Sequence, residues 1–206
     1  MSLPRYQVHR TPSAATPDWS LAECLTKFTF PWEPTPPPST EFRALWDGQT
    51  LAFRFDCEDE DIVIGQGETA MDRVLVSDRV EIFLAPSLEL KPYFCLEMSP
   101  DGDVLDYRAT HYREFERDWT CPGLVVRAEL TETRYCVSGS LPVATLRALD
   151  VLKTGAQEFY AGVFRGEFSH EADGSPRPGW MTWIDPQTER PDFHVPSAFG
   201  IFELIG

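Results

Sequence analysis

Residues 40–60, TEFRALWDGQTLAFRFDCEDE, carry the strongest local signal for the fold of this chain. Two runs rich in aromatic and aliphatic residues flank Asp47-Gly48, and an Asp-Gly pair between such runs is typical of a tight β-hairpin. The chain contains no asparagine, and Asp-Gly recurs at Asp101-Gly102 and Asp173-Gly174. Part of the acidic excess therefore belongs to turn chemistry rather than to an active site.

Further short strands are expected beyond this hairpin. DRVEIFLAP alternates, with Val80, Ile82 and Leu84 on one face, and the segment after it turns at Asp101-Gly102. Hairpins are expected at residues 92–109 and 124–142, the second turning around Thr131-Glu132-Thr133. Single strands are expected at 78–86, 158–168 and 199–205, and a short helix at 142–150. Many short strands separated by turns predict an all-β fold: an antiparallel, jelly-roll-like β-sandwich with at most one or two short helices.

Length and composition favour a single domain. The 206 residues fit one β-sandwich, and 42% hydrophobic residues can bury an ordinary core. Residues 1–18 are expected to form an irregular N-terminal arm. The proline-rich residues 30–40 are expected to pack on the sandwich, because too few residues precede them to fold separately. We therefore expect residues 1–206 to form one domain.

The formal net charge of −15 argues against nucleic acid or an anionic membrane surface as partner. No segment approaches the about 20 apolar residues of a membrane span. The five cysteines are widely spaced and lack a C-x-x-C pair, which favours free thiols in a reducing compartment. We expect a soluble monomer, cytoplasmic unless a leader precedes the given sequence.

Signatures of catalysis and of cofactor binding are missing. The four histidines form no H-E-x-x-H pattern, and neither G-x-S-x-G nor G-x-G-x-x-G occurs. The acidic run DCEDEDI (56–62) could hold calcium through carboxylate oxygens, although such runs are more often solvated loops. The sequence thus predicts no catalytic residue, no metal ligand and no cofactor, with calcium left open.

Glu81 and Glu97 lie on segments that are expected to pair. If these strands are neighbours, both carboxylates could project from one outer face, and two carboxylates are what glycoside hydrolysis requires. Two solvated glutamates on an exposed face are the simpler alternative.

Three segments together resemble the family 9 carbohydrate-binding modules. They are ALWDGQTLAFRFDCEDEDIV, SDRVEIFLAP and MTWIDPQTERPDFHVPSAFGIFEL, in the order and rough spacing of that family, and the resemblance covers about residues 19–206. The most specific parts are D-x-V-E-I-F and W-x-D-P followed by F-G. The family consists of non-catalytic β-sandwich modules attached to bacterial xylanases and related enzymes of polysaccharide degradation.

The resemblance also implies a site. In the family, a sugar lies between two tryptophan rings while charged and amide side chains bond its hydroxyls. The W-x-D-P tryptophan corresponds to Trp183 and the hydroxyl-accepting glutamate to Glu81. Leu75 stands where the family has its second tryptophan, and GVFRGEF offers Arg165 and Glu167 in place of the amides.

The spacing of Trp180 and Trp183 indicates that the two side chains have different roles. Three residues apart on a strand, the two rings point to opposite faces. We expect Trp183 to be offered to a ligand and Trp180 to lie in the core or at the rim. The candidate ligand-binding residues are Trp183, Glu81, Arg165, Glu167, Glu97 and Trp180.

The main hypothesis is a non-catalytic module that binds a mono- or oligosaccharide. Two alternatives remain open at this point. One is a haem-binding sandwich of the dehydrogenase-cytochrome type, with Met98 or Met181 paired with His111 or His194. The other is a glycoside hydrolase that uses Glu81 and Glu97.

Overall fold

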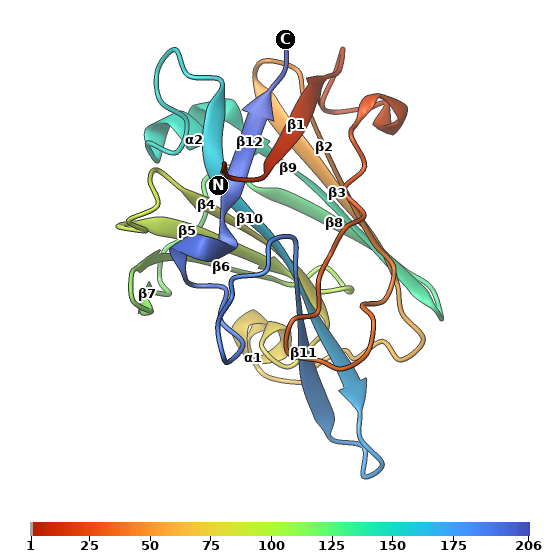
Figure 1. Ribbon diagram of the computed structural model, residues 1–206. Coiled ribbons are helices and arrows are strands. Elements are labelled where there is room, and N and C mark those ends of the chain that lie inside the picture. Colours follow the sequence, from red (N-terminus) through yellow and green to blue (C-terminus); the bar gives the residue numbers. More distant parts are fainter. Residues whose placement is uncertain (1) are drawn as a thin grey trace.

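The computed structural model describes residues 2–206 as a β-sandwich with two short helices, so the predicted fold class is confirmed (Figure 1). The strands are β1 (Arg5–Arg10), β2 (Thr40–Trp46), β3 (Thr50–Glu58), β4 (Arg79–Ala85), β5 (Tyr93–Met98), β6 (Val104–Thr110), β7 (Glu114–Glu116), β8 (Val125–Leu130), β9 (Arg134–Pro142), β10 (Glu158–His170), β11 (Pro176–Thr182) and β12 (Gly200–Leu204). The helices are α1 (Ala70–Val74) and α2 (Val143–Ala148), with single 3-10 turns at Trp19–Leu21 and Pro196–Ala198.

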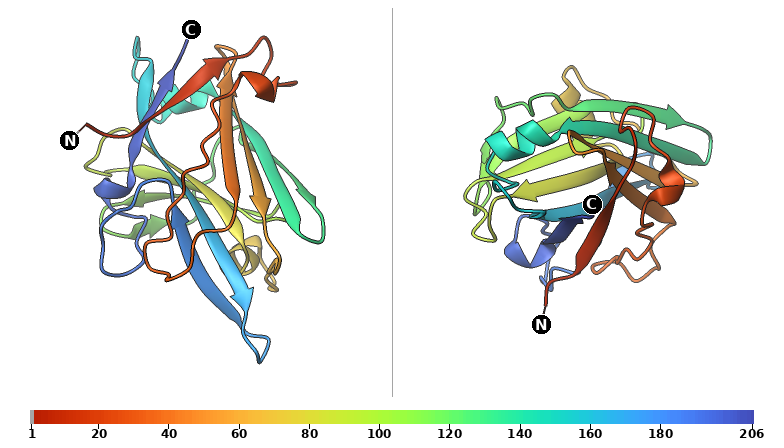
Figure 2. Two further views of the ribbon diagram at one scale, coloured as in Figure 1. Left: turned by 45° about the vertical axis from the view of Figure 1, so that its right-hand side comes forward. Right: turned by 90° about the horizontal axis from the view of Figure 1, so that it is seen from above.

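One curled, mixed sheet makes both layers of the sandwich. One layer follows the order β7-β6-β5-β4-β10-β12, the other follows β2-β3-β9-β8, and β1 joins them by pairing with β12 and with β2. Figure 2 shows the two layers from the side and from above. The main core lies between them, whereas β11 pairs with β10 and extends with it as a hairpin below the body in Figure 1.

The hairpin predicted from Asp47-Gly48 joins β2 and β3. Gly48 has a φ of 96°, which suits glycine, and the Asp47 carboxylate accepts hydrogen bonds from the backbone N–H groups of Gln49 and Thr50, both at 2.9 Å. The predicted hairpins β5–β6 and β8–β9 are also present. The turn residues in the sequence therefore predicted these three hairpins correctly.

The N-terminal segment differs from the expected irregular arm. Met1 lies outside the described residues, but Arg5–Arg10 forms β1, in which Tyr6 and Val8 are fully buried. The Tyr6 hydroxyl donates to the carbonyl of Glu23 and accepts from the amide of Ala44, both at 2.7 Å. The phenol thus satisfies an amide of β2 at the place where β1 turns from β12 toward β2. Both pairings of β1 are parallel and non-local, which leaves no turn signal in the sequence.

All five cysteines are free thiols, as predicted. Among residues 2–206, no helix is long and apolar enough to cross a membrane.

Arg165 crosses the interior from one layer to the other. It lies on β10, is completely buried, and its guanidinium donates to the Thr40 hydroxyl at 2.9 Å and to the Glu58 carbonyl at 3.1 Å. It also pairs with Asp59 at 3.0 Å and with Glu167. This buried cation therefore ties β10 to the start of β2 and the end of β3.

Replacing Arg165 with methionine is expected to lower the free energy of unfolding by about 3–5 kcal/mol, because two carboxylates and a carbonyl lose their partner inside the protein. Urea denaturation measures this loss. The matched control is Arg127→Met, at an exposed position on β8, where the change is expected to stay within about 0.5 kcal/mol. Equal stabilities of the two variants would contradict a structural role for Arg165.

Candidate functional site

A pocket of about 220 Å³ opens on the outer face of the layer that contains β4 and β5. Its lining comes from β4, β5, β6 and β11, from the residue that follows α1, and from residues 113–117 and 191–194. The main core lies on the opposite side of these strands, where Val80 and Ile82 are buried. Strand alternation therefore places the polar residues Arg79 and Glu81 in the pocket.

Two buried carboxylates lie side by side in this pocket. Glu81 and Glu97 are directly paired across β4 and β5 and are 2% and 4% exposed. The Arg79 Nε lies 2.8 Å from Glu81 Oε1 and 3.0 Å from Glu97 Oε2. The Tyr107 hydroxyl donates to Glu97 Oε1 at 2.6 Å. One guanidinium and one phenol therefore fix the orientation of both carboxyl groups.

The protonation of this group follows from its burial. Burial raises the pKa of Glu81 to about 8, the charge of Glu97 adds to the rise, and Arg79 opposes it. At neutral pH the Glu81 carboxyl therefore holds its proton. A protonated carboxyl can both donate and accept hydrogen bonds.

Trp180, on β11, forms an aromatic part of the pocket wall. The Arg79 guanidinium lies 5.0 Å from the centre of its ring, and Phe193 meets the ring at 5.7 Å and at 83°. Gly166 leaves space for Arg79, because a Cβ at that position would lie 3.3 Å from the Arg79 Cγ. Arg79 therefore connects the carboxyl pair to the aromatic wall.

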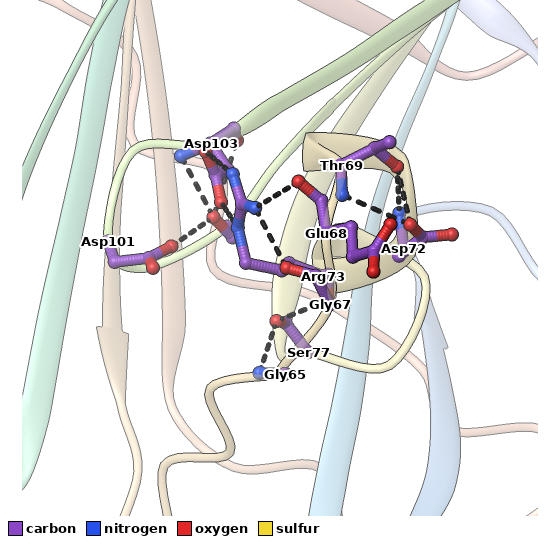
Figure 3. A network of polar contacts seen from close by, with 10 residues as sticks. Gly65, Gly67, Glu68, Thr69, Asp72, Arg73, Ser77, Asp101 and Asp103 are labelled. Carbon is purple, nitrogen blue, oxygen red and sulfur yellow. Dashed lines mark hydrogen bonds and ion pairs between the residues drawn. The ribbon is translucent and has the colours of Figure 1, made fainter.

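Short helix α1 is fixed to the turn between β5 and β6 (Figure 3). Thr69 and Asp72 form a reciprocal capping box at its start, with both amide contacts at 3.1 Å. The Arg73 guanidinium binds Asp103 through two nitrogens at 2.5 and 3.0 Å. These contacts hold α1 against the turn between β5 and β6.

Leu75 follows α1 directly and lines the pocket, 39% exposed. The Ser77 hydroxyl accepts from the Gly65 amide and donates to the Arg73 carbonyl, both at 2.8 Å, which stabilises the chain beyond the helix (Figure 3). The position that the family resemblance assigned to a second tryptophan therefore lies in the same pocket as Trp180.

Trp183 lies outside this pocket. Its ring packs 6.0 Å from that of Phe202 against the main core, and a Cβ at Gly200 would come within 2.7 Å of it. Trp180 packs instead against the outer cluster around Phe193. The two rings thus point to opposite faces, as their spacing predicts, and Trp180 rather than Trp183 lines the pocket.

Arg165 and Glu167 also lie away from the pocket. Glu167 belongs to a second acidic cluster in which oxygens of Asp59, Asp78 and Glu167 lie within 4.8 Å of one another. Burial raises the pKa of Asp78 to about 8 and that of Glu167 to about 7, with the charge of Asp59 adding to both and Arg165 opposing the rise at Glu167. Asp78 accepts from the amides of Val63 and Phe168, both at 2.6 Å. This cluster joins the loop before β4 to β10.

The acidic run at residues 56–62 is largely engaged in ion pairs and hydrogen bonds. Asp56 binds Arg54 at 2.6 Å, and Asp61 contacts His170 at 2.7 Å. Carboxylate oxygens such as those of Asp59 suit calcium. Arg165, however, already pairs with two of the three carboxylates of the cluster, so it supplies the positive charge there.

Both methionines considered for haem ligation lie apart from His194. Met98 and Met181 are buried in the core between the layers. His194 lies on the pocket side, where its Nδ1 contacts the Tyr93 hydroxyl at 2.9 Å. Burial lowers the pKa of His194 to about 3, and Arg113 adds to the decrease. Neither methionine therefore shares a site with His194.

The carboxyl pair also differs from a glycosidase pair. Hydrolysis needs two carboxyl groups that flank the scissile bond from opposite sides. Glu81 and Glu97 come from neighbouring strands and contact the same nitrogen of Arg79, so they face a ligand from one side.

Several pocket residues were not identified from the sequence. Strand alternation puts Arg79 on the same face as Glu81, and this signal could have found it. Residues 113–117 and 191–194 carry no periodic pattern, and only the folded chain brings them to the pocket.

Stability is expected to decrease as the pH rises from about 6.5 to 8.5. The raised pKa values of Asp78, Glu81 and Glu167 mean that the folded chain keeps protons which the unfolded chain loses near about pH 4. His194 adds little here, because above about pH 6.5 its imidazole is mostly neutral in both states. The urea midpoint should therefore be lower at pH 8.5, and Glu81→Gln should reduce the difference. An increase with pH would contradict the assigned protonation.

Solved structures with the same fold include carbohydrate-binding modules. A protein from Bacteroides uniformis ATCC 8492, for which carbohydrate binding has been suggested, has a TM-score of 0.76 at 16% identity, over 99% of this chain and 100% of its own. A family 9 carbohydrate-binding module from Caldicellulosiruptor kristjanssonii in complex with glucose has a TM-score of 0.64 at 14% identity, over 98% and 96% of the chains. A family 9 module from the same organism in complex with cellotriose has a TM-score of 0.63 at 13% identity, over 98% and 94% of the chains. These identities are low, and the likeness shows the fold.

No protein with a curated description matches the sequence. The family model described as carbohydrate family 9 binding domain-like matches residues 15–206. Because this match spans nearly the whole chain, the protein belongs to the family 9 carbohydrate-binding domain-like proteins.

Proposed function

We propose that the pocket beside Trp180 binds one sugar unit, either a monosaccharide or the end of an oligosaccharide, without chemical conversion. The observation that carries the proposal is the aromatic ring of Trp180 beside the fixed carboxyl pair Glu81 and Glu97 in one pocket. In this role the protein would serve as a recognition module for glycans.

The chemistry of a pyranose fits this arrangement. A pyranose has faces of C–H groups, which pack on an aromatic ring, and a rim of hydroxyls, which need hydrogen-bond partners from the side. Trp180 offers the aromatic surface, while Glu81 and Glu97 can accept from neighbouring hydroxyls. Arg79 and Tyr107 already hold the carboxyl groups in place, so little side-chain entropy is lost on binding.

Pocket size and the relatives support the same class of ligand. The volume of about 220 Å³ is below the about 300–1,000 Å³ of pockets for drug-sized ligands, which favours a single sugar unit. The related module from C. kristjanssonii binds glucose and cellotriose. We therefore expect a glucose-like unit to be accepted.

The pair of variants Trp180→Leu and Trp183→Leu tests the position of the site. Trp180→Leu is expected to weaken sugar binding about tenfold or more, because the aromatic platform is lost. Trp183→Leu is expected to bind sugar as the parent does, because Trp183 packs against the core outside the pocket. Isothermal titration calorimetry with glucose and cellotriose measures both affinities.

Circular dichroism and urea denaturation establish that each variant is folded. Retained binding in folded Trp180→Leu, together with loss in folded Trp183→Leu, would place the site at Trp183 instead. No heat of binding from any neutral or acidic sugar with the parent protein would overturn the proposed function.

A gain of affinity is expected from Leu75→Trp. The side chain at this position lines the pocket and is partly exposed, so an indole can extend over a bound sugar without entering the core. A second aromatic wall is expected to tighten binding of glucose severalfold, up to about tenfold. The matched control is Val76→Trp, at an equally exposed position that does not line the pocket, where no gain is expected. Unchanged affinity in a folded Leu75→Trp variant would contradict a pocket between positions 75 and 180.

A further inference from the structure

Three arginines line the pocket, and they differ in how their charge is balanced. Arg79 is buried and pairs with both Glu81 and Glu97. The Arg113 Nη1 lies 3.2 Å from an oxygen of Asp192. For the third, Arg117, no carboxylate oxygen of residues 2–206 lies within 4.0 Å of a guanidinium nitrogen, so it forms no ion pair with the described residues.

Arg117 is nevertheless held in position. Its guanidinium lies over the ring of Phe115 at 5.2 Å and near that of Tyr107 at 5.6 Å. Its Nη1 also contacts the Met71 Sδ at 3.4 Å. A guanidinium stacked on aromatic rings keeps its N–H groups free at its edge, in the plane that suits a planar or tetrahedral anion. These contacts orient Arg117 before any ligand arrives.

Arg113 flanks the same short strand, β7, from its other end. Its guanidinium lies 5.7 Å from the Phe115 ring, so both cations pack against one aromatic side chain. Its backbone adopts a φ of 61°, an uncommon conformation for a residue other than glycine. Asp192, its ion-pair partner, is also engaged by the Tyr112 hydroxyl at 2.6 Å and by the His194 amide at 2.9 Å.

The pocket lining brings three arginines together although the chain has a net charge of −15. They face Glu81, Glu97 and Asp192, and burial raises the pKa of Glu81 to about 8, so this carboxyl holds its proton at neutral pH. His194 is neutral there because of its lowered pKa. Among these arginines, Arg117 is the one without an ion pair to the described residues. A neutral sugar has no charged group that could form an ion pair with the Arg117 guanidinium.

Resting on the proposed function, we infer that the preferred ligand is an acidic sugar, whose anionic group binds Arg117 while its ring lies beside Trp180. The anionic group is a uronate carboxylate or a sulfate or phosphate ester. Such a group would accept charge-assisted hydrogen bonds from the guanidinium, with Arg113 adding long-range attraction. The inference thus names the class of sugar that the pocket selects.

The test compares acidic sugars with their neutral counterparts by isothermal titration calorimetry at low ionic strength. Glucose is set against glucuronate, glucose 6-sulfate and glucose 6-phosphate, and galactose against galacturonate. At least one acidic sugar is expected to bind about tenfold more tightly than its neutral counterpart. The preference should decrease with added salt, because the guanidinium edge is exposed to solvent. If the uronates bind more tightly than the sulfate and phosphate esters, the preferred anionic group is a carboxylate; the reverse order indicates an ester.

The variant Arg117→Gln is expected to bring the ratio of acidic to neutral affinity close to one. The matched control Arg127→Gln removes an exposed arginine on β8, outside the pocket, and is expected to keep the parental ratio. Equal affinities for neutral and acidic sugars in the parent would overturn the inference while leaving the proposed function intact. An unchanged preference in folded Arg117→Gln would also overturn it.

Discussion

The contact of Arg79 with Glu81 and Glu97 is the interaction on which the site depends. Two carboxyl groups on neighbouring strands could not both be buried without a counter-charge, because desolvation and mutual repulsion would expel or neutralise them. Arg79 supplies that charge from the same face of β4 and also lies against Trp180. The strands β4, β5 and β11 are thereby joined by one guanidinium, and their polar groups remain available to a ligand.

Arg165 performs a different task on the adjacent strand. It faces Val80 in the register of β4 and β10, but its side chain enters the space between the layers and binds groups of β2 and β3. Two buried arginines one register step apart thus serve opposite faces of one layer. Arg165 joins the two layers of the sandwich, whereas Arg79 lies in the pocket, so the ligand-binding role that the family resemblance implied for Arg165 does not match its position.

The sequence predicted those parts of the fold that local chemistry determines. The Asp-Gly turns and the alternation in β4 led to the hairpins and to the pairing of Glu81 with Glu97. Strand β1 was not predicted, because its parallel partners β2 and β12 are distant from it in the sequence. Alternation showed that Trp180 and Trp183 face opposite ways, but not which face carries a pocket. That depends on residues 113–117 and 191–194, whose positions only tertiary packing determines.

The central claim is that a sugar binds against Trp180 on the outer face of the sandwich. Two-dimensional NMR of the six tryptophan indole N–H groups during titration with a sugar tests it most directly, because each ring reports separately. We expect the signal of Trp180 to shift in proportion to saturation, while that of Trp183 stays in place. A shift at Trp183 with none at Trp180 would contradict the assignment of the pocket.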